Sequence, residues 1–259
     1  MYFVIFIVLI TIFFAYADDR KLIKNGYWIS FWILTISMSL RFGYGNDYFS
    51  YMEIFKKVNS YPNFYSAYYN LGVEPGWVLL SRLLKPFGFQ MQIFIVGFLI
   101  YFIYYTLIDR YVTRPYRWIG IALFLLNAKL FLLNLSMLRQ GLAGTFLFYS
   151  IILSIENKNI KSVILFLLAI SVHTSAFIGV PFIMAIILQK IIKPEYLIYV
   201  SVLIAIGLFI KPEIGDYFFT FLLDSNEISG MYGQYIVSQN ESSSGTGIGV
   251  MIQYIAIIP

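Results

Sequence analysis

Cysteine is absent from this sequence, histidine occurs once, and only 12% of the residues are charged. The lack of cysteine excludes disulfides, thiol nucleophiles and cysteine-ligated metals. With one histidine and no Asp-x-Asp pair, no cluster has metal-ligand spacing, so we expect a protein without a metal. Neither a Walker-type phosphate loop nor a dinucleotide-binding glycine motif is present, and we expect no other cofactor.

The shortage of charge decides the fold class. A soluble globular domain carries roughly 25% charged residues, about twice the fraction found here, whereas 60% of this chain is hydrophobic and 20% is aromatic. So few charges cannot cover the surface of a soluble protein with 259 residues. Lipid must therefore solvate much of the surface, and the many aromatic side chains suit the interface between membrane and water.

Hydrophobic runs that are long enough to cross a bilayer, or nearly so, recur along the chain. They predict an all-α fold, a polytopic transmembrane helical bundle that forms a single domain over residues 1–259. The last run begins at Ile248 and stops at Pro259, which is too short for a span, so we expect further C-terminal helices to be missing from this sequence. The runs cover residues 2–16, 27–40, 91–108, 118–133, 142–155, 160–172, 176–188, 196–210 and 248–259.

Basic residues lie in short clusters between these runs and predict the topology. Arg20, Lys21 and Lys24 follow the first run, so the positive-inside rule places this loop in the cytoplasm and the N-terminus outside. With alternating spans, ten basic and five acidic residues fall inside, against eight of each outside. The segment Ala15-Tyr16-Ala17 resembles a signal-peptidase site, but cleavage would leave a basic segment outside, so we expect the first helix to be retained. Membrane topology thus explains the net charge of +5, and we expect no nucleic-acid partner.

Two long segments then fall on the outer side. Residues 41–90 must return to the side that they left, so we predict an outer loop with two interfacial or re-entrant helices. A helix from Asp47 would place Tyr51 on the same face, and Glu74-Pro75 would open a second helix because proline is favoured in a first turn. The second outer loop covers residues 211–247 and ends in a flexible run of serine and glycine.

Ionisable residues gather near the outer ends of the predicted helices: Arg41, Asp47, Glu74, Arg139 and His173. A charge near a membrane span is costly and indicates function by default. Each residue also has a structural alternative. An arginine can snorkel to the interface, an acid can cap a helix start, and a histidine can satisfy a bond between helices.

This set of side chains suits a phosphorylated substrate. Outward-facing arginines present planar forks of donors that bind phosphate or diphosphate, and they would stabilise the negative charge of a departing diphosphate. A carboxylate or imidazole beside them could act as general base for a hydroxyl nucleophile. The catalytic candidates are Asp47, Glu74 and His173, and the substrate-binding candidates are Arg41, Tyr51, Arg82, Arg139, Gln140 and Ser175. For Arg82, contact with lipid headgroups is an equal alternative.

Four segments, in this order, resemble the EpsG branch of the Wzy-like polysaccharide polymerases: RFGYGNDYFSYM, EPGWVLLSRLL, LSMLRQGLAGTFLF and SVHTSAFIGVP. The resemblance extends from Arg41 to Pro181, just over half the chain, and depends on the ordered set, since each segment alone is weakly specific. It implies a GT-C-like bundle in the bacterial cytoplasmic (inner) membrane, with an active site on the outer face. Family members continue for several more helices, so the length of this chain departs from the pattern.

The resemblance also implies a reaction. A metal-independent glycosyltransferase would join oligosaccharide repeat units carried on undecaprenyl diphosphate, and so build O-antigen, capsule or exopolysaccharide. The glycan would leave its lipid diphosphate when a sugar hydroxyl of the next unit attacks it. Arg139 and Arg41 are the candidates for contact with the diphosphate. The implied partners are the lipid-linked oligosaccharide and membrane lipid, with a chain-length regulator and a flippase as further candidates.

Two other functions stay open. An O-antigen ligase, or another GT-C-type glycosyltransferase, would use the same chemistry with a different acceptor. A transporter of lipid-linked sugars would use the same arginines for binding alone, with broken helices at mid-depth and an internal repeat. The sequence shows no convincing repeat, and its polar residues lie near one face instead of at mid-depth.

Overall fold

The computed structural model of the chain describes residues 2–40, 42–43, 47–127, 131, 134, 136–188, 196 and 199. Throughout these residues the regular secondary structure is helical, as predicted. The chain divides into two compact units, Met1–Ile191 and Ile192–Pro259, and only the first is described below. Apart from two positions of the run at 196–210, the last two predicted runs and the outer loop at 211–247 lie outside the described residues.

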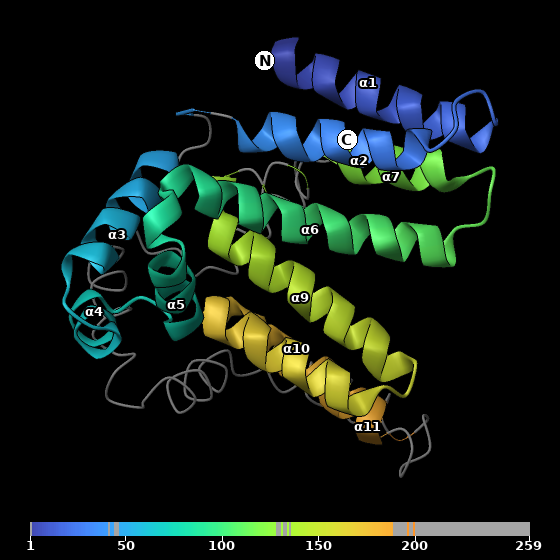
Figure 1. The fold of residues 1–259 in the computed structure, drawn as a ribbon. Helices are drawn as coiled ribbons and strands as arrows, with labels where there is room; N and C mark the ends of the chain where they lie inside the picture. Colours follow the sequence, from blue (N-terminus) through green and yellow to red (C-terminus); the bar gives the residue numbers. More distant parts are fainter. Residues whose placement is uncertain are drawn as a thin grey trace, which may run out of the picture. The chain divides into compact units, whose positions relative to one another are not determined.

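Long apolar helices pack side by side in the first unit (Figure 1). Along the chain, the first helix packs against the second, the second against α6, α6 against α9, and α9 against α10. Two of them, α6 and α9, are long and apolar enough to cross a bilayer. The helices are α1 (Tyr2–Asp19), α2 (Gly26–Ser39), α6 (Phe89–Tyr111), α7 (Arg117–Leu126), α9 (Leu138–Ile155), α10 (Asn159–Val172) and α11 (Val180–Leu188).

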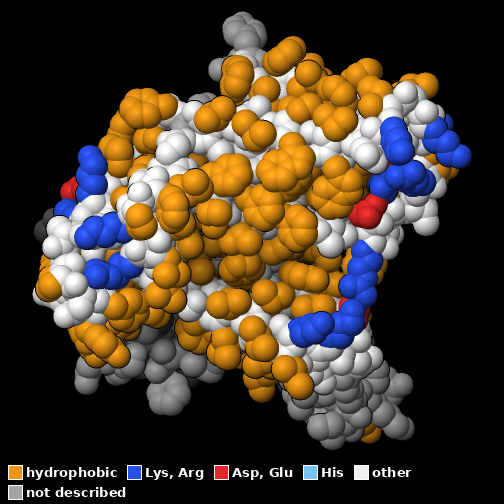
Figure 2. Space-filling view, in the orientation of Figure 1, with side chains coloured by type: hydrophobic (Ala, Val, Ile, Leu, Met, Phe, Trp, Pro, Cys, Tyr) orange, Lys and Arg blue, Asp and Glu red, His pale blue; other side chains and the backbone are white. Residues whose placement is uncertain are grey.

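A belt of hydrophobic side chains crosses the middle of the molecule, with lysine and arginine toward its two ends (Figure 2). The first helix contributes Phe3, Phe6 and Leu9, and the second contributes Trp32, all with exposed side chains. An apolar surface this large and continuous is not compatible with water. The chain is therefore a helical membrane protein, in agreement with its composition.

Two of the predicted runs are broken in the structure. The run at 118–133 gives a helix that ends at Leu126, because the backbone at Asn127 turns to an extended conformation. The run at 176–188 gives a 3₁₀ segment, η2 (Thr174–Gly179), followed by α11. Pro181 explains the restart, since proline cannot donate a backbone hydrogen bond and is favoured in the first turn of a helix.

The segment between α2 and α6 folds into short helices at one end of the bundle, namely α3 (Tyr48–Ser60), α4 (Phe64–Leu71), α5 (Pro75–Leu83) and the 3₁₀ turn η1 (Lys85–Phe87). The helices expected after Asp47 and Glu74 are both present. The fourth helix was not anticipated; Asn63 opens it with a capping box, in which its side chain accepts from the backbone N–H of Ser66 at 2.8 Å. We call this end of the bundle the α3–α5 end.

The loops at 20–25, 112–116 and 156–158 lie together at the opposite end, which we call the basic end (Figure 1). An ion pair of 2.8 Å joins Arg110, near the end of α6, to Glu156, which follows α9. Another of 2.9 Å joins Arg117, at the start of α7, to Asp19, at the end of α1. Successive long helices therefore alternate in direction between the basic end and the α3–α5 end. The polar candidates that the structure describes belong to the latter.

Candidate functional site

Glu74 lies at the centre of a cluster of polar side chains at the α3–α5 end. Only 6% of this residue is exposed. One carboxylate oxygen, Oε1, lies 2.5 Å from Nδ1 of His173 and also accepts the backbone N–H of Thr174 at 3.4 Å. The other oxygen, Oε2, accepts a hydrogen bond of 2.7 Å from Nη1 of Arg139. Three segments far apart in the sequence thus meet at a single carboxylate.

The side chains of Glu74, Arg139 and His173 all lie at the ends of helices. Glu74 caps α5, and its carbonyl accepts the backbone N–H groups of Trp77 and Val78. Arg139 lies in the first turn of α9, and His173 directly follows α10, with an extended backbone that leads into η2. Because α9 runs away from the α3–α5 end and α10 returns to it, the start of one and the end of the other are neighbours.

Gly76 permits the close approach between α5 and α10. A Cβ atom at this position would lie 2.4 Å from Oγ of Ser171 and 2.7 Å from its carbonyl oxygen. Both distances are far shorter than a van der Waals contact, and one of them involves backbone that cannot rotate away. Only glycine therefore lets the first turn of α5 touch the last turn of α10, which places Glu74 within reach of His173.

We expect Gly76→Ala to push these two helices apart and to break the contact between Glu74 and His173. Overpacking of this kind costs about 1–3 kcal/mol of stability, and a shift of roughly 1 Å in a catalytic geometry can cost about 100-fold in activity. The measurements are the thermal unfolding midpoint in detergent and the activity defined below. Gly144→Ala is the matched control: it lies in α9 with no atom within 4 Å of the added Cβ, so its stability should be unchanged or higher. Equal behaviour of the two variants would contradict the proposed constraint.

The charge state of Glu74 follows from its surroundings. Burial by itself would raise the pKa of the carboxyl group, but the hydrogen bond with His173 and the charge of Arg139 outweigh burial, so the pKa lies below its ordinary value. The carboxyl group is therefore ionised at neutral pH, and an ionised carboxylate only accepts hydrogen bonds. Nδ1 of His173 must carry the proton of their hydrogen bond, and in a neutral imidazole this leaves Nε2 as an acceptor.

Arg139 rests on an aromatic support. Its guanidinium lies 5.7 Å from the centre of the Tyr51 ring, within the range of a cation–π interaction. Tyr51 is buried and packs on the fully buried ring of Trp77, with 5.6 Å between the centroids. Burial raises the pKa of the Tyr51 hydroxyl, which therefore stays protonated. The side chains of Arg139 and His173 each remain 22% exposed, so both can still be reached from outside.

Three of the next four candidates lie in the described part of the chain. Gln140 follows Arg139 in the first turn of α9 and is partly buried, and Ser175 is exposed in η2 two residues after His173. Asp47 precedes α3 without a capping bond from its side chain. Arg41 lies outside the described residues. For all four, a role in binding or catalysis stays a prediction.

Arg82 has a structural task in this fold. Its guanidinium donates to the backbone carbonyls of Val58, Tyr61 and Pro62, at 3.4, 3.1 and 3.2 Å. These bonds close the C-terminal end of α3 and fix the turn into α4. Contact between Arg82 and a substrate or a lipid headgroup remains a prediction.

Two residues of the cluster were not singled out from the sequence. Gly76 and Trp77 directly follow Glu74-Pro75, a segment interpreted only as the opening of a helix. Gly76 lets α5 approach α10 because it lacks a side chain, and the ring of Trp77 supports Tyr51. Neither contact is visible in a local pattern. A glycine in the first turn of a helix is the one signal that could have drawn attention, because glycine is costly inside helices unless a close approach requires it.

The cluster can perform two chemical tasks. The imidazole of His173 can accept a proton at Nε2, with Glu74 holding the ring and stabilising the imidazolium. The guanidinium of Arg139 has five N–H donors, of which one goes to Glu74, and it can bind an anion. In the described part of the chain, no group of three or more His, Asp or Glu side chains is placed so that it could hold a metal ion.

Comparison with known proteins gives one match. The sequence model described as the EpsG family matches residues 24–259, which include every residue of the cluster around Glu74. No curated protein and no solved structure matches the chain.

Proposed function

The chain belongs to the EpsG family, and from this premise we propose that it polymerises oligosaccharide repeat units carried on undecaprenyl diphosphate. The family supports a polysaccharide polymerase in general terms. The observation that carries the specific reaction is the single buried carboxylate of Glu74, which holds an imidazole and a guanidinium side by side. Such a pair suits transfer of a glycan from a diphosphate to a hydroxyl group.

In the proposed reaction, His173 acts on the attacking hydroxyl group and Arg139 acts on the leaving diphosphate. A sugar hydroxyl of the incoming unit gives its proton to Nε2 of His173, and its oxygen attacks the anomeric carbon of the growing glycan. The bond from that carbon to the diphosphate oxygen breaks, and the lipid diphosphate leaves with the electron pair. The guanidinium of Arg139 stabilises its negative charge. Glu74 is a positioning residue that keeps the proton on Nδ1 and balances the imidazolium.

The proposed reaction takes place on the outer face of the bacterial cytoplasmic membrane. The turn between α1 and α2 carries Arg20, Lys21 and Lys24, and the positive-inside rule assigns the basic end to the cytoplasm. The α3–α5 end then faces outward. There the reaction draws its energy from the lipid diphosphate bond, without a nucleotide sugar or a metal ion.

A reconstituted assay tests the proposal directly. The purified protein, given lipid-linked repeat units alone in liposomes with a chelator, is expected to produce a ladder of lengthening lipid-linked glycans. A requirement for a different acceptor would instead identify a ligase, and movement of the lipid-linked unit across the bilayer without a new bond would identify a transporter. A requirement for added metal would overturn the metal-independent mechanism.

Arg139→Ala is expected to slow this ladder by roughly 100-fold or more, because removal of one preorganised donor from a developing anion has that effect. The measurement is the initial rate of repeat-unit transfer at saturating substrate. Lys56→Ala is the matched control, since it removes an exposed positive charge from α3 at the same end of the bundle. An Arg139→Ala rate equal to that of Lys56→Ala would show that the guanidinium does not act on the leaving group.

A further inference from the structure

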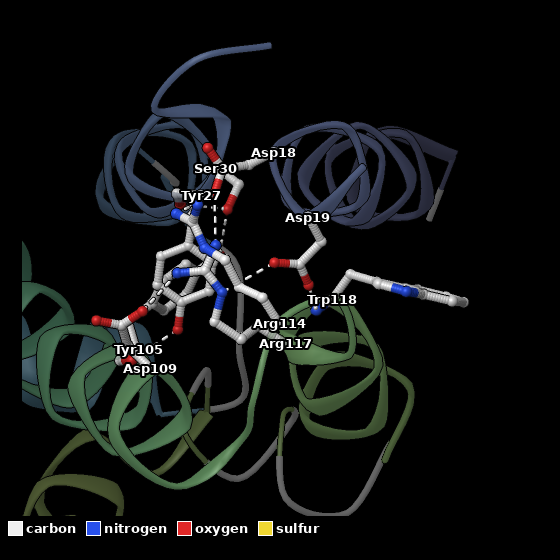
Figure 3. Close-up of polar contacts among 9 residues, drawn as sticks. All are labelled: Asp18, Asp19, Tyr27, Ser30, Tyr105, Asp109, Arg114, Arg117 and Trp118. Atoms are coloured by element: carbon white, nitrogen blue, oxygen red, sulfur yellow. Dashed lines mark hydrogen bonds and ion pairs between the residues drawn. The ribbon is translucent and has the colours of Figure 1, made fainter. Parts of the chain in front are cut away.

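A second cluster of charged residues lies at the basic end, away from the site around Glu74 (Figure 3). Its centre is Arg117, the first residue of α7, which is only 4% exposed. Each guanidinium nitrogen contacts a different carboxylate. Nε donates to Asp19 at 2.9 Å, Nη2 to Asp18 at 2.5 Å, and Nη1 to Asp109 at 2.5 Å. Three acids therefore surround one buried cation.

Four helices meet at this cation. Asp18 and Asp19 are the last two residues of α1, and both are buried. Asp19 also accepts the backbone N–H of Trp118 at 2.9 Å, which caps the start of α7. The guanidinium of Arg117 lies 4.3 Å from the ring of Tyr27 in α2, and Asp109 belongs to α6. Arg114, in the loop before α7, adds an ion pair to Asp18 at 3.1 Å.

Compensation of the buried charge comes mainly from α1. A buried guanidinium is costly unless it is paired. The side chain of Asp109 is 44% exposed, so water weakens its share, whereas those of Asp18 and Asp19 are 5% and 0% exposed. Without the end of α1, Arg117 would keep a single, solvated partner. The matched family segment begins at residue 24, so both of these acids precede it.

The hydrophobic effect by itself does not hold α1 at one position in the bundle. Within a bilayer there is little hydrophobic drive for one apolar helix to leave lipid for another. The face that α1 turns toward the bundle is built from small or aliphatic side chains, including Ile7, Val8 and Ala15. The specific polar contacts of α1 with α7 lie at its last two residues. These contacts are therefore the specific polar interactions that can fix the position of α1 against α7.

We propose that Asp18, Asp19, Asp109, Arg114 and Arg117 form an ionic lock that docks α1 against α2 and α7 by charge compensation. The lock fixes the register of α1, and the edge-to-face contact between the rings of Tyr16 and Trp118, at 5.4 Å, marks that register. Docking of α1 thereby depends on buried charges, although the sequence alone would place these residues in exposed loops.

A crosslinking experiment tests the lock without reference to activity. Because the chain contains no cysteine, Tyr16→Cys and Trp118→Cys introduce one defined pair of thiols between α1 and α7. A short bifunctional thiol reagent is applied to membranes, and the joined peptides are quantified by mass spectrometry. The parent pair is expected to be joined efficiently, and Glu53→Gln, which removes an exposed ion pair in α3, should not change the yield.

Two further variants separate charge compensation from shape. Asp18→Asn with Asp19→Asn leaves Arg117 poorly compensated, and the crosslinked fraction should fall about tenfold or more. Addition of Arg117→Met removes the buried cation as well, and the fraction should return to within about twofold of the parent. An unchanged yield in the asparagine variant would overturn the lock. The lock would also be overturned if the crosslinked fraction of the triple variant were no higher than that of the asparagine variant. If the asparagine variant fails to accumulate in the membrane, failure of the triple variant to accumulate would overturn the lock in the same way.

Discussion

His173→Ala is expected to slow ladder formation by at least about 100-fold while the protein still accumulates in the membrane. General base catalysis by a positioned imidazole contributes roughly 10²- to 10⁴-fold to a rate, so the initial rate of repeat-unit transfer should fall within that range. The physical reason is the arrangement around Glu74. Its carboxylate lies 2.5 Å from Nδ1 of His173, which keeps the proton there and leaves Nε2 to accept the proton of the attacking hydroxyl.

His173→Gln separates the loss of the base from the loss of a contact. A glutamine amide can donate a hydrogen bond to Glu74 but has no nitrogen that accepts a proton near neutral pH. We expect His173→Gln to unfold at nearly the native temperature and yet to be as inactive as His173→Ala. Native rates in the glutamine variant would show that His173 holds Glu74 in place and is not the base.

Glu74→Gln is expected to be comparably severe. The amide group can no longer hold the proton on Nδ1 of His173, so the imidazole favours the tautomer in which Nε2 is already protonated. The corresponding change of a carboxylate to an amide behind a catalytic histidine in serine proteases lowers kcat by about 10⁴. We therefore expect a loss of roughly 10³-fold or more in the initial rate of transfer.

Two comparisons test this explanation. Glu53→Gln removes an exposed carboxylate that pairs with Lys57 at 2.7 Å, and exposed pairs of this kind contribute at most about 1 kcal/mol, so activity and stability should stay near the native values. The double variant of Glu74→Gln with His173→Gln should be no slower than the slower single variant. When two residues act as one unit, the loss of either already removes the rate enhancement that both supply. Additive losses would indicate that the two residues act independently.

Much of the fold was predictable from the sequence because lipid imposes simple requirements on a chain. A helix is the unit that satisfies its own backbone in hydrocarbon, so a long apolar run is enough to predict one. The runs at 91–108 and 142–155 correspond to α6 and α9, and Pro75 opens a helix as expected. The predicted run at 118–133 is interrupted, because Asn127 ends α7 within it.

The candidate site was predictable as a set of residues, but not as an arrangement. Glu74, Arg139 and His173 were selected from the sequence because an ionisable group near a span is costly. The sequence assigned Arg139 to the diphosphate but did not decide between Glu74 and His173 as the base, and each residue had a structural alternative. The structure places Glu74 between the other two, with both of its oxygens engaged, and the positioning role proposed for this carboxylate rests on that arrangement.

The sequence by itself determined that the chain is a membrane protein, where long helices such as α6 and α9 lie, and which loops carry the basic residues. Only the tertiary structure decided which charges are buried. Asp18, Asp19 and Arg117 counted as ordinary loop residues in the topology, yet they form the core of the basic end. The reason is physical: the free-energy cost of a buried charge depends on its partners. Here the partners lie on other helices, about 100 residues away in the chain, so no local sequence pattern predicts these contacts.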